Sequence, residues 1–405
     1  MKNTLKGKNI LITQSALRVI AGSEIVALEL AEALQKKGAN VRIFTWEYGT
    51  PIMQYVQQKN IRVTCNERDP FFKKCDYIWV HHQVLPELVI EELFKNSSYS
   101  PRIMFMHMSG LPTNHIEQPY INGLEKRISD KSYYVSTEAK NLIEQMFYSS
   151  NTPVESGLFQ NYFPVRFADK QYSRRELKKI LVVSNHPPQE VIELRSLSGS
   201  ISITYMGEKN KDYKMITPEI ILAHDAVISI GKTVQYCLAC GVPVYIYDKF
   251  GGCGYLTRRN FAKNENKNFS GRGYKKKSAP QIMRELISGY DEARTHQAAI
   301  KDSMIKKFCL DDKLLDIFKP LSKQKTIDAE LYYPTIATMS MAKWKLKGDF
   351  YVKELKDIIN IRDTEIRMLR QNSRNLESKI QGFKNSRTYK IVTAINRFIG
   401  KNTGL

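Results

Sequence analysis

Long hydrophobic runs are missing from this sequence. No apolar segment approaches the roughly 18 residues of a membrane-spanning helix. Residues 1–8 lead directly into a strand pattern and do not have the character of a signal peptide. We therefore expect a protein that is made in the cytoplasm and stays there.

Cysteine is scarce, with six residues in a chain of 405. Most of the cysteines lie in or beside apolar segments, so we expect reduced, buried thiols and no disulfide scaffold. Cys237 and Cys240 form a C-x-x-C pair with Cys253 nearby, but no further His or Cys pair follows at the spacing of a zinc site. The sequence also has no Asp-x-Asp pattern that would hold a divalent ion. We expect no bound metal.

Acidic residues are too few to balance the basic ones, and the net charge is +21. This excess favours an anionic partner such as nucleic acid, acidic lipid or a phosphorylated substrate. No helix-turn-helix, zinc finger or aromatic RNA platform is visible, which argues against nucleic acid. The hydrophobic content of 42% is sufficient for ordinary cores, and the length predicts two domains with an appendage.

The first part of the chain alternates strand and helix patterns, which is typical of a parallel, doubly wound sheet. A helix is predicted over residues 23–37, with Val26, Leu30 and Leu34 on one face and Gly38 as its stop. This is a Rossmann-like opening. The expected strands are residues 9–13, 41–45, 77–80, 102–106 and 132–135.

A proline- and aromatic-rich passage at residues 157–167 interrupts the alternation, which then begins again. We expect a first domain over residues 1–160 and a second, also Rossmann-like, over 161–320. Two such α/β domains face a cleft, and ligands bind outside the carboxyl ends of their strands. The strands expected in the second domain are residues 180–183, 201–204, 226–230 and 242–247.

A heptad pattern follows a connector at residues 321–350. Over residues 351–383 the positions spaced alternately by four and three are apolar except for an arginine and a serine, which predicts a coiled coil and a possible homo-oligomer. A helix docked on the body would show the same stripe. The positions are Leu355, Ile359, Arg362, Ile366, Leu369, Ser373, Leu376, Ile380 and Phe383.

The last segment, residues 384–405, is basic and contains no acidic residue. It predicts an amphipathic helix that binds an anionic membrane surface, with a solvated tail as the alternative. The basic residues are Lys384, Arg387, Lys390, Arg397 and Lys401. The residues that share the apolar face are Tyr389, Val392, Ile395, Phe398 and Ile399.

The most informative stretch is residues 225–256. An apolar strand leads into Gly231, Lys232 and Thr233, which begin a short helix that stops at Gly241. Free backbone N–H groups and the helix dipole at such a start favour a phosphate. A second buried strand and an expected glycine-rich loop follow. The pattern indicates nucleotide-sugar binding.

Residues 239–244 read A-C-G-V-P-V and match the A-x-G-x-P-V pattern of the donor-binding half of glycosyltransferases with the GT-B fold. The chain resembles these enzymes, especially family 4 (glycosyltransferase group 1) and related surface-polysaccharide enzymes, over roughly residues 8–320. It departs from family 4 at Tyr236, where a ribose-binding glutamate is usual, and in lacking the usual arginine and lysine near residues 184–188.

The resemblance implies transfer of a sugar from a nucleotide-sugar donor to a hydroxyl of a glycan, expected to be lipid-linked, at the inner membrane face. The nucleotide-sugar is a substrate, so no cofactor is implied. Lys232 is expected to replace the missing cations at the diphosphate, with Lys209 and Arg258 as weaker candidates. The expected donor-binding residues are Asn185, His186, Gly207, Gly231, Lys232, Thr233, Gln235, Tyr236, Asp248, Gly251 and Gly252.

Two further groups lie where the first domain should meet the cleft. Gly22, Ser23 and Glu24 are expected to face acceptor and donor phosphates, although a turn and an N-cap explain the same residues. His81, His82 and His107 follow two strands, and one of them is expected to be catalytic, as a base or as a donor-orienting group.

Other functions fit the same architecture. A nucleotide-sugar 2-epimerase or a polyol-phosphate transferase would use a similar donor site, but a soluble epimerase needs neither a coiled coil nor a basic tail. A basic coiled-coil scaffold without enzymatic activity is the third alternative.

Overall fold

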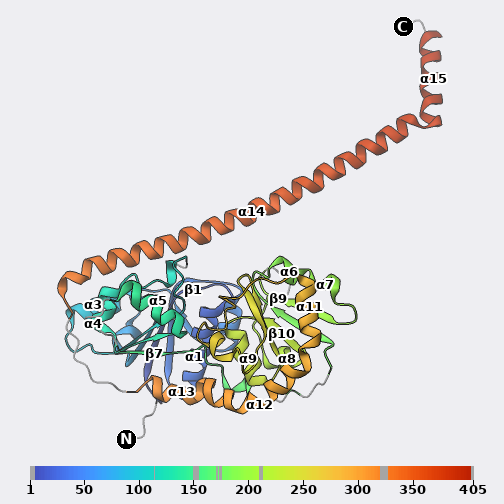
Figure 1. The fold of residues 1–405 in the computed structure, drawn as a ribbon. Helices are drawn as coiled ribbons and strands as arrows, with labels where there is room; N and C mark the ends of the chain where they lie inside the picture. Colours follow the sequence, from blue (N-terminus) through green and yellow to red (C-terminus); the bar gives the residue numbers. More distant parts are fainter. Residues whose placement is uncertain are drawn as a thin grey trace. The chain divides into compact units, whose positions relative to one another are not determined.

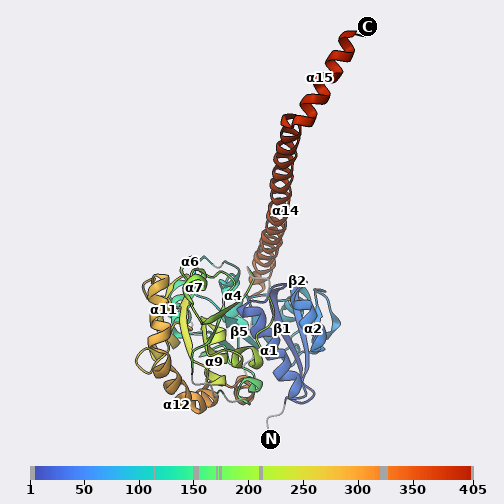
Figure 2. The same cartoon turned by 90° about the vertical axis from the view of Figure 1, so that its right-hand side faces the viewer.

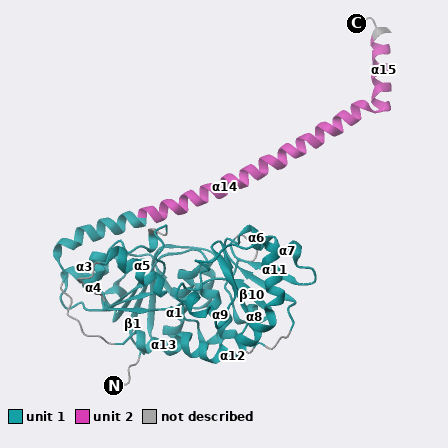
Figure 3. Ribbon diagram, in the orientation of Figure 1, with its two compact units in different colours: residues 1–343 teal, residues 344–405 magenta. Residues whose placement is uncertain are grey.

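The computed structural model describes residues 5–113, 115–148, 155–169, 172, 176–208, 213–319 and 327–402. The chain divides into two compact units, Met1–Lys343 and Trp344–Leu405, which Figure 3 colours separately. Residues 321–326 of the expected connector and the last three residues of the expected tail lie outside the described residues.

The first unit contains two sheets, of which the first belongs to the amino-terminal domain (Figure 1). Its strand order is β3-β2-β1-β4-β5-β6-β7, and all neighbours are parallel. The direction of strand addition reverses between β1 and β4, which is a topological switch point. The strands are β1 (Asn9–Leu17), β2 (Asn40–Tyr48), β3 (Arg62–Thr64), β4 (Tyr77–His81), β5 (Arg102–His107), β6 (Lys131–Tyr134) and β7 (Ser156–Leu158).

Helices connect these strands, and the first of them, α1, is placed by its apolar face. Val26, Leu30 and Leu34 are buried in the domain core, and the chain leaves the helix through Gly38 at a φ of +82°. The α-helices of this domain are α1 (Gly22–Lys36), α2 (Ile52–Gln58), α3 (Glu87–Lys95), α4 (Asn122–Ile128) and α5 (Thr137–Phe147). This domain also contains the 3-10 turns η1 (Pro70–Lys74) and η2 (His115–Glu117), whereas η3 (Val165–Phe167) lies at the start of the second domain, with Phe167 in its core.

The second sheet has the order β12-β11-β10-β8-β9, and only the β11–β12 pair is antiparallel. Its switch point lies between β8 and β10. The strands are β8 (Lys179–Val183), β9 (Ser202–Met206), β10 (Ala226–Ser229), β11 (Val244–Asp248) and β12 (Gly251–Tyr255). The helices are α6 (Gln189–Ile192), α7 (Leu194–Leu197), α8 (Pro218–Leu222), α9 (Lys232–Cys240), α10 (Phe261–Glu265), α11 (Ala279–Ser288) and α12 (Tyr290–Phe308).

The chain returns to the first domain after α12. Figure 2 shows α2 on the outer side of the first domain and α11 on the outer side of the second. Helix α13 (Leu310–Ile317) follows, and Leu310, Leu314 and Phe318 belong to the core of the first domain. The two domains are therefore joined by packing as well as by the chain between β7 and β8.

A short turn, η4 (Ala329–Leu331), precedes the long helix α14 (Tyr332–Asn385), whose first residues belong to the first unit. There Lys343 Nζ lies 2.5 Å from Glu67 Oε1. The second unit consists of the rest of α14 and of α15 (Arg387–Asn402). No helix among the described residues is both long enough and apolar enough to cross a membrane.

The expectation of two Rossmann-like domains of the GT-B class with a helical extension is confirmed by these two sheets and helices. The short edge strands β3 and β7 are additional. The glycine-rich loop expected after β11 was wrong, because Gly251, Gly252 and Gly254 lie in strand β12, paired with β11. Residues 189–197 form two short helices, α6 and α7.

At position 252, the close packing of β12 against β11 leaves no room for a side chain. A Cβ atom at this position would lie 1.9 Å from the carbonyl oxygen of Ile246. We expect Gly252→Ala to force β12 away from β11, to cost about 1–3 kcal/mol and to lower the melting temperature by roughly 3–10 °C. Gly22→Ala is the control, because nothing lies within 4 Å of a Cβ there. Equal melting temperatures for the two variants would refute this account of β12.

Candidate functional site

A cavity of about 440 Å³ lies where the carboxyl ends of the two sheets face each other. The first domain contributes the loop between β1 and α1 together with Met108 and Glu117. The second domain contributes the loops after β8 and β10 and the end of β11. Both sheets therefore present their switch points to one cavity, which is where doubly wound folds bind ligands.

Two helices begin at this cavity from opposite domains. Helix α1 follows Ala21 and helix α9 follows Gly231, and neither N-cap residue makes a side-chain capping hydrogen bond. Gly231 has a φ of +60° and no atom within 4 Å of an added Cβ, so the start of α9 is open. The first N–H groups of both helices thus point partial positive charge toward one space.

The loop after β8 is fixed against both domains. Asn185 Nδ2 donates to the carbonyl of Ile20 in the first domain at 3.3 Å, and Asn185 Oδ1 accepts from the Glu208 N–H at 3.1 Å. Gly207 is required beside this loop, since a Cβ would lie 2.0 Å from the Ser184 carbonyl oxygen. Asn185 therefore connects the two sides of the cavity.

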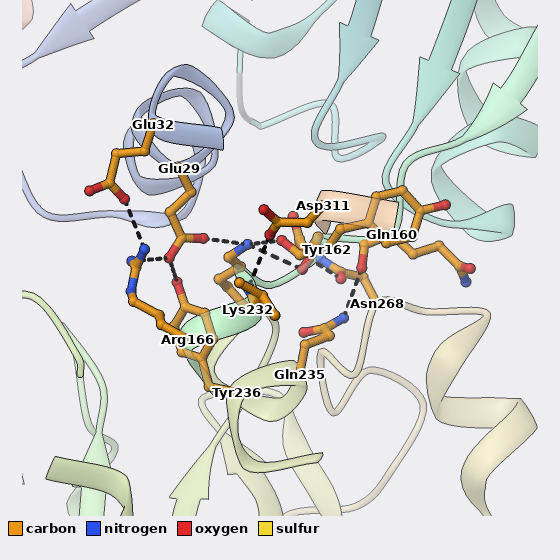
Figure 4. Close-up of polar contacts among 12 residues, drawn as sticks. Glu29, Glu32, Gln160, Tyr162, Arg166, Lys232, Gln235, Tyr236, Asn268 and Asp311 are labelled. Atoms are coloured by element: carbon orange, nitrogen blue, oxygen red, sulfur yellow. Dashed lines mark hydrogen bonds and ion pairs between the residues drawn. The ribbon is translucent and has the colours of Figure 1, made fainter. Parts of the chain in front are cut away.

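A buried ion cluster joins the domains behind the cavity (Figure 4). Glu29 of α1 is fully buried, and its carboxylate lies 3.0 Å from Arg166 Nη2 and 2.7 Å from Lys232 Nζ. It also accepts a hydrogen bond of 2.8 Å from the hydroxyl of Tyr236. A second carboxylate of α1, Glu32, pairs with Arg166 Nη1 at 2.8 Å. We call Glu29, Arg166, Lys232 and Tyr236 the Glu29 cluster.

Lys232 is both a cavity residue and a member of this cluster. Its Nζ donates to the carbonyls of Asn161 at 3.2 Å and Tyr162 at 2.5 Å, in addition to its ion pair with Glu29. Burial lowers the pKa of Lys232, and the nearby Glu29 carboxylate acts in the opposite direction. The expected phosphate ligand is thus occupied by protein groups in this arrangement, although its side chain lines the cavity.

The residues expected at the donor hydroxyl make contacts of their own. Tyr236 stacks on Phe167 with ring centroids 4.0 Å apart and planes at 6°, and burial raises its pKa well above the ordinary value. Gln235 Nε2 donates to the carbonyl of Gln160 at 3.1 Å. Tyr236 lines the cavity and Gln235 does not.

The start of α1 reaches the cavity through Gly22 and Ser23. Ser23 Oγ accepts from Gln14 Nε2 at 3.2 Å and donates to Glu24 Oε2 at 2.9 Å. Burial raises the pKa of Glu24 to about 7. Glu24 is therefore held beside the cavity wall, in the first turn of α1, without lining the cavity.

None of the three histidines lines the cavity. His81 is fully buried with neither ring nitrogen hydrogen-bonded, and His107 Nε2 lies 2.9 Å from the buried Glu125. His82 Nδ1 shares a hydrogen bond of 2.7 Å with Ser15 Oγ, and its Nε2 lies 3.6 Å from Glu117 Oε1. Burial lowers the pKa of His82 to about 3. Only His82 therefore touches a carboxylate that lines the cavity.

The structure brings most of the other expected residues together at the cavity. Gly251 and Gly252 are in β12 and do not line it, nor does Arg258, and Lys209 lies outside the described residues. The cavity-lining residues that belong to the expected set are Gly22, Ser23, Asn185, His186, Gly207, Gly231, Lys232, Thr233, Tyr236 and Asp248.

Other cavity residues were not expected from the sequence. Glu117 lies in the segment that follows the carboxyl end of β5. Because ligands bind at the carboxyl ends of strands in this fold, that position was the sequence signal that could have identified Glu117. Tyr213 accepts a hydrogen bond of 2.6 Å from the Ile20 N–H, a contact with no sequence signal. The polar residues that line the cavity outside the expected set are Glu117, Asn161, Ser184, Tyr213, Lys214, Ser229, Lys249 and Asn268.

A search for metal ligands over the described residues finds no group of three or more His, Cys, Asp or Glu side chains. Cys237 and Cys240 are buried in α9 and form no disulfide. Metal-independent chemistry stays a prediction.

No protein-family model matches the chain, and no curated protein matches it. Solved structures are similar at low identity. A glycosyltransferase from Rickettsia africae ESF-5 is 14% identical, with 77% of this chain and 98% of that chain covered and a TM-score of 0.49. An alpha-glucosyltransferase in complex with UDP and a 13-mer DNA is 12% identical, with coverages of 77% and 100% and a TM-score of 0.46. WaaG, a glycosyltransferase involved in lipopolysaccharide biosynthesis, is 10% identical, with coverages of 77% and 100% and a TM-score of 0.43.

Because the Glu29 cluster is buried and spans the two domains, we expect the effects of substituting Glu29 and Lys232 on the free energy of unfolding to be strongly coupled. Glu29→Gln removes the buried carboxylate charge while keeping its size, and it leaves Lys232 buried without its ion pair. We expect a loss of about 3–5 kcal/mol in the free energy of unfolding, measured by urea denaturation. In the double variant with Lys232→Met, the loss should be smaller than the sum of the single losses by about 1–3 kcal/mol.

The matched control is Glu176→Gln, which removes an ion pair with Lys178 in which both side chains are more than 70% exposed. Solvent screens an exposed pair of this kind, so the control should leave the urea denaturation curve nearly unchanged. Additive effects of Glu29→Gln and Lys232→Met would show that the two side chains are not coupled.

Proposed function

We propose that the protein is a glycosyltransferase that moves a sugar from a nucleotide-sugar donor to a hydroxyl of a glycan acceptor. The observation that supports this most directly is the pair of uncapped helix starts, α1 and α9, which face one cavity from the two domains. A ligand held there must carry negative charge along its middle, as a nucleoside diphosphate does, with room on either side for a base and a sugar.

The same geometry suits the chemistry of sugar transfer. The departing diphosphate gains negative charge as the bond to the sugar breaks. N–H groups that point at the diphosphate therefore stabilise the transition state more than they stabilise the bound nucleotide-sugar. The N–H groups at Gly22 and Ser23 and those at Lys232 and Thr233 supply such donors without a metal ion. In this proposal the bound nucleotide-sugar and acceptor displace water from the space between the two domains, which favours transfer over hydrolysis.

The first domain supplies the acidic group that would act on the acceptor. Glu117 lines the cavity and lies beside His82, which in turn bonds Ser15. In this proposal Glu117 accepts the proton of the acceptor hydroxyl, and His82 is a positioning residue behind it. Neither His81 nor His107 lines the cavity, and in this proposal both act only on the fold.

The acceptor is proposed to be lipid-linked, with the protein bound peripherally to the inner membrane face through α15. The helix carries Arg387, Lys390 and Arg397 and no acidic residue, and Ile395 and Phe398 are exposed. A basic amphipathic helix of this kind binds anionic lipid surfaces. This observation favours a transferase over a soluble 2-epimerase.

Nucleotide binding tests the donor site. We expect one of UDP, GDP, CDP and dTDP to raise the melting temperature selectively. Gly22→Asp should abolish this shift, because it places a carboxylate beside the diphosphate and weakens binding by roughly tenfold or more. The apo melting temperature should not fall, since an acidic residue in the first helical turn is favourable and the site has room for the side chain.

Gly22→Asn is the matched control, because it is similar in size to Asp and uncharged, and it should retain most of the shift. A well-folded protein that responds to no nucleotide, or a Gly22→Asp variant that binds as tightly as the wild type, would overturn the proposed position of the diphosphate. With the donor identified, formation of an epimerised nucleotide-sugar instead of a glycosylated acceptor would assign the 2-epimerase function.

Vesicle sedimentation tests the membrane contact. The full chain should bind phosphatidylglycerol-containing vesicles more tightly than phosphatidylcholine vesicles, and less tightly as salt rises. Changing Lys390 and Arg397 to Gln removes about 2 kcal/mol of attraction and should weaken binding roughly thirtyfold. The control is the same change at Arg367 and Arg374 of α14, with no loss expected. Equal binding by both variants would contradict the assignment of α15.

A further inference from the structure

The part of α14 in the second unit exposes a regular apolar stripe. Its side chains recur at intervals of three and four residues, and those that define the stripe are all more than 40% exposed. A long helix in water derives most of its stability from packing of its apolar face, and these residues have no such packing within the described chain. The stripe therefore requires a partner surface.

The residue types along the stripe point to a second copy of the same helix as the partner. In heptad notation, the a positions carry β-branched apolar residues except for one serine: Val352, Ile359, Ile366, Ser373 and Ile380. The d positions carry Leu355, Arg362, Leu369, Leu376 and Phe383. Isoleucine at a with leucine at d favours a two-stranded parallel coiled coil over trimers and tetramers. A helix that docks on an irregular protein surface has no reason to keep this alternation.

The one charged residue of the stripe is compatible with a second copy. Arg362 occupies a d position, and its flanking residues Asp363 and Glu365 lie at e and g. Within one helix Arg362 Nη1 already lies 3.2 Å from Glu365 Oε2. Two copies in parallel register place both arginines among four carboxylates.

The charged residues that flank the stripe would form one attractive and one repulsive pair between two parallel copies. In a parallel pair, a g residue faces the e residue five positions later on the other helix, so Glu365 faces Arg370 of the second copy with opposite charge. Lys379 and Lys384 form a like-charged pair near the end of the stripe, and Phe383 at d covers the core there.

We infer that residues 352–383 of α14 form a parallel, in-register, two-stranded coiled coil with a second copy of this chain. The surface is independent of the proposed transferase activity. Parallel pairing brings the two α15 helices, which follow at residue 387, to the same end of the coiled coil. One dimer would thus present two basic amphipathic helices to one surface.

Light scattering of the full chain after gel filtration tests the pairing. The wild type should have twice the monomer mass at micromolar concentration. Ile366→Asn with Leu369→Asn, at a and d, should give a monomer. The matched control is Ile361→Asn with Met368→Asn, two equally exposed apolar residues at c positions, and it should remain a dimer. Circular dichroism and nucleotide response report that the first unit is intact in each variant.

A monomeric wild type, or a dimer that survives the a and d substitutions, overturns the inference. Orientation is tested separately by Leu376→Cys in a Cys65→Ser background, which removes the exposed native thiol. Mild oxidation should join the two copies through position 376, because a parallel, in-register pair places these d positions face to face. An antiparallel pair would place position 376 opposite position 359 of the second copy, so the absence of a 376–376 disulfide in a dimer contradicts parallel pairing.

Discussion

The arrangement of the two domains in the first unit depends on the buried carboxylate of Glu29, whose charge must be paired within the protein. An ionised side chain with no exposure to water is very costly unless it is paired and hydrogen-bonded. All three groups that satisfy it, Arg166, Lys232 and Tyr236, come from the second domain. Separation of the domains would leave these charges unpaired, so the cluster holds α1 against α9 and sets how the starts of the two helices face each other.

The cavity follows from this arrangement together with the strand order of each sheet. Helix α1 lies at the β1/β4 switch point and α9 follows β10 at the switch point of the second sheet, so helix starts are delivered where strands end. Helix α13 adds Leu314 and Phe318 to the core of the first domain and thereby anchors the end of the second. In the proposed function, backbone N–H groups at these two helix starts bind the diphosphate, so the site does not depend on a particular charged side chain.

Periodicity in the sequence was sufficient to predict the two Rossmann-like domains, helix α1 and the helix start at Gly231, because each depends on residues close in the chain. It could not predict the Glu29 cluster. Glu29 and Arg166 are far apart in sequence, and a glutamate on an amphipathic helix ordinarily marks a solvated face. Strand β12 was mistaken for a loop because its glycines are explained only by the close approach of β11. The burial of His81 and His107 was likewise invisible without the packing around them.

Amide hydrogen exchange, with and without the nucleoside diphosphate that stabilises the protein, tests most directly whether both domains bind one anion. The account predicts slower exchange in the first turns of both helices, at Gly22 and Ser23 in α1 and at Thr233 in α9, when the nucleotide is bound. Protection confined to one of the two helix starts, or found only elsewhere in the first unit, would contradict a shared diphosphate site.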